Sequence, residues 1–196
     1  VTAQHREMLD QVLRLFEIQP DHDLNLMENQ QDLFSITTGA LNGLKGVLEA
    51  ERPDLVIVHG DTTTTLAASL AAFYMRIPVA HVEAGLRTRN KYSPYPEEMN
   101  RTLTGRLAEL HFAPTDTSRE NLLAEATAEF KIWVTGNTVI DALLSIIRDD
   151  YEFGPEFAGI DMTKRMLLVT THRRENWGER MREIYRALLE LVEEFP

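Results

Sequence analysis

Several short apolar segments of this sequence end in side chains that could do chemistry. Asp61 follows one such segment, Glu83 follows the next along the chain, and His172 follows the last. Carboxylates and histidines can give and take protons near neutral pH. Open parallel sheets bind their ligands outside the carboxyl ends of the strands, so these residues would face one rim. The sequence therefore predicts an acid–base site at that rim.

Several acidic and basic residues at these strand ends and helix starts also have a structural explanation. Asp61 can cap a helix that begins directly after it. His59 and His81 can be core histidines with satisfied hydrogen bonds. Glu97 and Glu98 open another expected helix, where acidic side chains suit the helix dipole. A functional site is nevertheless favoured, because acids, bases and guanidinium groups converge at the ends of several strands.

The segments that must position these residues alternate between strand and helix patterns. Short apolar runs predict strands at 54–59, 78–82, 111–113, 132–134 and 165–169. Apolar residues at helical spacing predict helices at 7–16, 32–50, 62–76, 97–110, 117–125, 137–148 and 178–195. This alternation is typical of an α/β fold with a Rossmann-like parallel sheet. The continuous apolar strands indicate helices on both faces of that sheet.

A change of pattern after the helix expected at 137–148 divides the chain. We expect a Rossmann-like domain at 1–150, a linker at 151–164, and the first strand and helix of a second Rossmann-like domain at 165–196. One strand and one helix cannot bury a core by themselves, so we expect the rest of that domain to be absent. Because the chain starts at Val1 and ends directly after a helical pattern, we expect both ends to be cut from something longer.

The composition argues against several classes of function. The 196 residues carry 20 Lys and Arg against 31 Asp and Glu, and this net charge of −11 disfavours nucleic acid and anionic membranes as partners. The chain has no cysteine, which excludes disulfides, thiol catalysis and Cys-bound zinc within it. It has no apolar run of membrane-spanning length and no Gly-x-Gly spacing for a nicotinamide cofactor. We expect no membrane association and no cofactor.

Two pairs of a histidine and an acid leave a metal site as an alternative. His59 and Asp61 are two residues apart, as are His81 and Glu83, and such spacings could supply metal ligands. Residues two apart share a face only while a strand stays extended, and Gly60 interrupts one of the pairs. We therefore expect no bound metal, and a metal-dependent hydrolase that uses these four side chains remains an alternative function.

Longer motifs run through the whole chain. They are His59-Gly-Asp-Thr-Thr-Thr-Thr65, His81-Val-Glu-Ala-Gly-Leu-Arg87, Tyr92-Ser-Pro-Tyr-Pro-Glu-Glu-Met-Asn-Arg101, Thr135-Gly-Asn-Thr-Val-Ile-Asp141 and His172-Arg-Arg-Glu-Asn176. With these motifs the sequence resembles the bacterial non-hydrolysing UDP-N-acetylglucosamine 2-epimerases over essentially its full length. The resemblance implies a GT-B-like architecture of two Rossmann-like domains. This chain would be most of the first domain and the start of the second.

The resemblance also implies an isomerase reaction that inverts C2 of the sugar and gives UDP-N-acetylmannosamine. In the family, UDP leaves C1 as the C2 proton is removed, which produces an enzyme-bound 2-acetamidoglucal. UDP then adds back while the other face of C2 is protonated. The residues that match the family's catalytic positions are Asp61, Glu83, Glu97 and His172. Substrate binding is expected at Arg87, Asn137 and Arg173, and a second, regulatory nucleotide-sugar site at Gln4 and His5.

The same resemblance suggests the setting of the reaction. We expect a UDP-sugar as the partner, a homodimer at full length, a cytoplasmic location and a product used for cell-envelope or capsule polysaccharide. The Asp61-Thr-Thr-Thr-Thr65 run favours the non-hydrolysing branch over a hydrolysing 2-epimerase, which would release N-acetylmannosamine and UDP. The family's first glycine loop and C-terminal UDP-binding segment have no counterpart here, so we expect the chain alone to be an inactive fragment.

Overall fold

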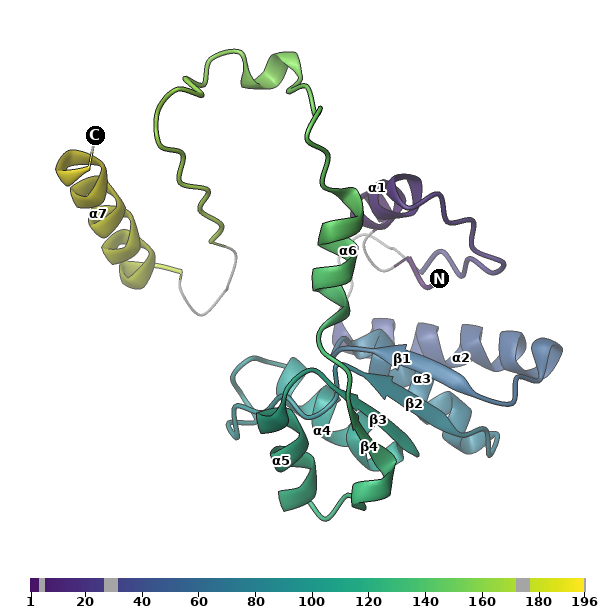
Figure 1. Cartoon of the computed structure of the whole chain (residues 1–196). Helices are drawn as coiled ribbons and strands as arrows, with labels where there is room; N and C mark the ends of the chain where they lie inside the picture. The colour runs from purple at the N-terminus through teal and green to yellow at the C-terminus, as the bar shows by residue number, and fades with distance from the viewer. Residues whose placement is uncertain (4–5, 27–31, 172–176, 196) are drawn as a thin grey trace. The chain divides into compact units, whose positions relative to one another are not determined.

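The computed structural model describes residues 1–3, 6–26, 32–171 and 177–195 (Figure 1). The chain divides into two compact units, Val1–Ile146 and Ile147–Pro196. The first unit contains the sheet and every described residue of the predicted site.

A four-stranded parallel sheet forms the centre of the first unit (Figure 1). The strands lie side by side in chain order, as β1 (Val56–His59), β2 (Val79–Val82), β3 (Leu110–Ala113) and β4 (Ile132–Val134). The helices that connect them are α3 (Thr63–Tyr74), α4 (Glu97–Leu107) and α5 (Asp116–Ala124), and a short helix η1 (Glu129–Lys131) precedes β4. The predicted α/β class with a parallel sheet is confirmed, and all four strands fall within the predicted ranges or one residue beyond them.

The two faces of the sheet differ in how well they are covered. The strand register aligns Val58, His81, His111 and Ile132 across one face, and all four residues are buried. When strand order follows chain order, right-handed crossovers bring the connecting helices to the same face. On the other face Ile57 is 65% exposed. Its register neighbour Ala80 is fully buried, so this face is open at β1 but not across its whole width.

Three further helices belong to the first unit. They are α1 (Arg6–Leu15), α2 (Leu33–Glu51) and α6 (Thr138–Ile146). Helix α2 begins with a reciprocal cap, in which the Asp32 carboxylate accepts a hydrogen bond from the Ser35 amide at 2.7 Å. Helix α5 is capped by Thr115, whose hydroxyl accepts a hydrogen bond from the Ser118 amide at 3.2 Å, and it begins one residue before the range expected from the sequence.

The second unit contains a short helix, η2 (Pro155–Phe157), and a long one, α7 (Glu179–Glu194). The predicted helix at 178–195 is thus confirmed. The strand predicted at 165–169 is wrong for this structure, because the described residues there have no regular secondary structure. A strand needs a neighbour for its backbone hydrogen bonds, and the described part of this unit offers none. None of the described helices combines the length and apolar character needed to cross a membrane.

His81 is a buried titratable group in the sheet. Its side chain is fully buried, and its Nε2 lies 2.7 Å from the Gly60 carbonyl oxygen, to which it donates as the Nε2–H tautomer. Its Nδ1 is buried and has no hydrogen-bond partner among the described residues. Burial, assisted by the positive charge of nearby Arg87, lowers the pKa of His81 to about 4. The folded chain therefore holds this imidazole neutral, so His81 is a core histidine.

This burial predicts that acid destabilises the sheet through His81. The unfolded chain takes up a proton below a pKa of about 6.5, whereas the folded chain resists protonation down to about 4. The free energy of unfolding should therefore fall as the pH drops through this window, by roughly 2 to 3 kcal/mol at pH 4.5 from this group. Urea unfolding followed by circular dichroism at pH 7 and pH 4.5 measures the loss. His81→Gln should lose less than the parent between the two pH values; equal losses in the two proteins would contradict the prediction.

Candidate active site

Asp61 lies two residues beyond the end of β1 and is held by helix α4 in two ways. Its carboxylate forms an ion pair with the guanidinium of Arg101 through Oδ2 and Nη2. Its backbone carbonyl accepts a hydrogen bond from the Asn100 side chain at 2.9 Å. The Asp61 side chain is still 26% exposed. A carboxylate that is fixed and open to solvent on one side can act on a bound ligand. The cap of α3 is the hydroxyl of Thr62, so Asp61 is not used for capping.

Glu83 occupies the corresponding place after β2. Its backbone φ is +64°, a left-handed conformation that is uncommon for residues other than glycine. Its Oε1 accepts a hydrogen bond from Asn137 at 3.3 Å. A Cβ atom added to Gly60 would lie 3.3 Å from Oε2 of Glu83, so this carboxylate lies against the residue that precedes Asp61. The carboxyl ends of β1, β2 and β4 thus contribute Asp61, Glu83 and Asn137 to one place, as the sequence predicts.

Helix α4 begins at Glu97 and carries the third predicted carboxylate. Glu97 is partly exposed, whereas its neighbour Glu98 is 3% exposed. Glu98 accepts hydrogen bonds from the backbone amides of Thr88 and Arg89 at distances of 2.8–3.1 Å. It also accepts one from Arg101 at 3.3 Å. The two adjacent acids therefore differ in role, since only Glu97 is open to a ligand.

Arg87, a predicted substrate-binding residue, is buried in an ion pair with Glu125 at the C-terminal end of helix α5. Its side chain is 3% exposed, and it binds both oxygens of Glu125 at 2.7 and 2.9 Å. Its remaining terminal nitrogen donates to the Leu86 carbonyl at 2.7 Å. The Arg87 guanidinium lowers the pKa of Glu125, which keeps the pair ionised. Each of the three guanidinium nitrogens thus has a partner within the protein, and the substrate-binding role expected for Arg87 stays a prediction.

The loop after β2 reaches α5 through a glycine. Gly85 has a φ of +87°, and a Cβ added to it would lie 2.2 Å from the Ser118 carbonyl oxygen. Asn121 of α5 donates to the Gly85 carbonyl at 3.0 Å. The backbone of this loop thus contacts α5 more closely than any other residue type allows. Together with the Arg87–Glu125 pair, this contact fixes the segment that follows Glu83.

The two histidines considered as metal ligands lie in different environments. His59 is exposed, and its Nε2 lies 3.3 Å from the Thr138 hydroxyl at the start of α6. His81 is buried on the helix-covered face and bound to a backbone carbonyl, so it does not share a ligand set with Glu83. In the part of the chain that the structure describes, no three His, Asp or Glu side chains are grouped to hold a metal ion. The four-residue metal site considered from the sequence is therefore not assembled.

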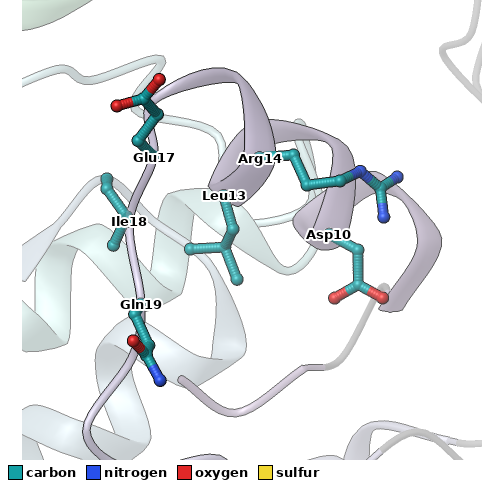
Figure 2. Close-up of a pocket in the computed structure, with 6 residues that line it drawn as sticks. All are labelled: Asp10, Leu13, Arg14, Glu17, Ile18 and Gln19. Atoms are coloured by element: carbon teal, nitrogen blue, oxygen red, sulfur yellow. The ribbon is translucent and has the colours of Figure 1, made fainter.

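Four predicted site residues, His172, Arg173, Gln4 and His5, lie outside the described residues. A surface hollow of about 380 Å³ lies elsewhere, beside α1 (Figure 2). Its lining residues are Asp10, Leu13, Arg14, Glu17, Ile18 and Gln19, and Figure 2 shows their side chains around an open depression. None of them belongs to the predicted acid–base site, so this hollow adds nothing to it.

Sequence reasoning missed the residues that hold the acids in place. Asn100 and Arg101 of α4 contact Asp61, and Glu98 contacts the loop after β2. The available signal was the spacing of Glu98 and Arg101, which are three residues apart on a predicted helix and so share one face. That signal predicts a pair but gives no reason to place Asp61 beside it.

These features define a parallel α/β domain with acidic side chains gathered at the carboxyl ends of its strands. A family model described as UDP-N-acetylglucosamine 2-epimerase matches residues 1–196. The UDP-N-acetylglucosamine 2-epimerase of Escherichia coli K12 is 59% identical over 200 residues, which cover 98% of this chain and 53% of that protein. This chain belongs to the UDP-N-acetylglucosamine 2-epimerase family.

Solved structures agree with this assignment. The Neisseria meningitidis UDP-GlcNAc 2-epimerase bound to UDP-GlcNAc has a TM-score of 0.91 and 55% identity, over 100% of this chain and 54% of that one. The S. aureus protein MnaA, solved with UDP, has a TM-score of 0.89 and 48% identity, over 100% of this chain and 51% of that one. The chain therefore spans about half the length of the relatives that it matches.

Proposed function

We propose that the protein to which this chain belongs interconverts UDP-N-acetylglucosamine and UDP-N-acetylmannosamine by inverting C2 of the sugar. The observation that carries the proposal is the approach of Glu83 to the Gly60–Asp61 turn, which brings acids from two strands to one edge of the sheet. Epimerisation needs a group that takes a proton from one face of C2 and a group that gives one to the other face. Two carboxylates from separate loops suit that requirement.

The proposed reaction proceeds by elimination and re-addition. One carboxylate takes the C2 proton while the C1–O bond to UDP breaks, which leaves a C1–C2 double bond in 2-acetamidoglucal. UDP then attacks C1, and a proton is delivered to the opposite face of C2. Positive charge that develops at C1 is stabilised by a nearby carboxylate. The departing diphosphate is stabilised by the α6 N-terminus after Asn137, and by His172 and Arg173 in the segment outside the described residues.

The proposal extends to the setting of this reaction. The protein acts as a homodimer in the cytoplasm, uses no metal or nicotinamide, and supplies amino sugars for cell-envelope or capsule polysaccharide. It follows the non-hydrolysing route, in which UDP stays on the enzyme until it adds back. A hydrolysing 2-epimerase would instead release N-acetylmannosamine and UDP, so product analysis separates the two branches. Gln4 and His5 belong to a second, regulatory nucleotide-sugar site.

A chimera provides a full-length background for the tests of this proposal. In it, residues 1–196 of this chain replace the matched segment of the Escherichia coli relative, which supplies the other half of a complete enzyme. The chimera should convert UDP-N-acetylglucosamine to UDP-N-acetylmannosamine, whereas this chain alone should not. A folded chimera without turnover would overturn the proposed function.

The three accessible carboxylates should each be needed for turnover in the chimera. Asp61→Asn, Glu83→Gln and Glu97→Gln should each lower kcat by at least about 100-fold, the usual contribution of a general acid or base. Thermal unfolding of Glu83→Gln and Glu97→Gln should stay close to that of the parent, whereas Asp61→Asn also removes a charged partner of Arg101 and should unfold at a lower temperature while remaining folded at the assay temperature. Glu49→Gln, which changes an exposed acid on α2, is the control and should keep the parent kcat. Near-normal turnover in all three site variants would show that the site is misassigned.

The fate of the C2 hydrogen tests the elimination step. When the chimera reacts in deuterated water, UDP-N-acetylmannosamine should carry deuterium at C2, because the original proton leaves and is replaced from solvent. Nuclear magnetic resonance of the isolated product measures this, with a parallel reaction in ordinary water as the control. Full retention of the original hydrogen would exclude elimination and re-addition. Accumulation of free N-acetylmannosamine with UDP would instead identify the hydrolysing branch.

A further inference from the structure

The first turns of helix α4 contain a carboxylate that does not face the proposed ligand. Glu98 has a side chain that is 4% exposed, and its partners are two backbone amides and one guanidinium. A buried carboxylate without donors would cost several kcal/mol, so this group is retained only where donors surround it. Here the donors come from two places, the loop after β2 and the next turn of α4.

Arg101 connects this buried carboxylate to the proposed site. Its Nη1 donates to Oε2 of Glu98 at 3.3 Å, and its Nη2 is paired with Oδ2 of Asp61. The Arg101 side chain is 11% exposed, so water competes little for either contact. A guanidinium is a rigid planar fork, so its orientation toward Glu98 determines where its other nitrogen meets Asp61. A lysine ammonium has no such fixed geometry.

We propose that Glu98 and Arg101 are positioning residues for the epimerase site. Arg101 fixes the carboxylate of Asp61, and Glu98 fixes both Arg101 and the amides at 88–89 in the loop that follows Glu83. Neither residue touches the substrate. The pair sets the distance between the acid after β1 and the acid after β2, because α4 contacts both segments. This inference rests on the proposed function and adds the two residues that keep its acids at a fixed distance from each other.

A positioning role predicts a loss of rate without a loss of binding. In the active chimera, Arg101→Gln should lower kcat by about 10- to 100-fold with KM within about twofold, since misplacing a reacting group by about 1 Å has an effect of that size. Arg101→Lys keeps the charge but cannot hold two carboxylates at fixed angles. Its kcat should therefore lie between those of the parent and of Arg101→Gln. Arg119→Gln removes a different ion pair, with Glu129, and should keep the parent kcat.

A double-mutant cycle separates positioning from a general loss of structure. If Arg101 acts through Asp61, the double variant Asp61→Asn/Arg101→Gln should be no slower than Asp61→Asn alone. If Arg101 only supports the fold, the two losses should multiply. Multiplied losses, or a kcat for Arg101→Gln equal to that of the parent, would overturn the proposal while leaving the proposed function intact. An inactive parent chimera would overturn both.

Glu98 is tested through the loop that it holds. Hydrogen exchange of the amides at 88 and 89 should speed up in Glu98→Gln relative to the parent, while amides in α5 stay unchanged. The kcat of Glu98→Gln should fall with KM near that of the parent. If Arg101→Gln fails to fold, the kcat and KM of Arg101→Lys and Glu98→Gln test the proposal instead. Unchanged exchange at 88–89 together with unchanged kcat would overturn the role of Glu98.

Discussion

The contact of Arg101 with two carboxylates is the interaction around which the site is organised. Charged groups removed from water are stable only when they are paired and hydrogen-bonded, and Glu98 and Arg101 are both almost fully buried. The third member, Asp61, remains partly open. Breaking a buried pair by removing one partner leaves an uncompensated charge, so α4, the β1 end and the loop after β2 are constrained to stay together.

The parallel sheet explains why these segments meet at all. Strands in chain order with connecting helices on one face bring every strand's carboxyl end to the same rim. Asp61 and Glu83 are 22 positions apart in the sequence, yet their strands are hydrogen-bonded neighbours. Asn137 joins them from β4, two strands away from β2. The fold therefore assembles a compact site from short segments that have no local preference for each other.

Much of this architecture could be predicted from the sequence, because strands and helices leave strong local patterns. The strand ends that carry Asp61 and Glu83 were visible as apolar runs followed by acids. The difference between Glu97 and Glu98 was not visible in the sequence, because both residues suit a helix start and only tertiary packing buries Glu98. The ion pair of Arg87 with Glu125 was not visible either, because the two residues are 38 positions apart in the sequence. The strand expected at 165–169 had the right composition but no neighbour to pair with in the described residues.

In the proposed reaction, the acids after β1 and β2, held by α4, meet opposite sides of one sugar ring. The most direct measurement is a crystal structure of the chimera with UDP-N-acetylglucosamine bound. Carboxylate oxygens of Asp61 and Glu83 should lie within hydrogen-bonding reach of the sugar, about 3 Å directly or through one water, with Arg101 still paired to Asp61. A sugar ring bound away from both carboxylates while that pair is intact would contradict the account.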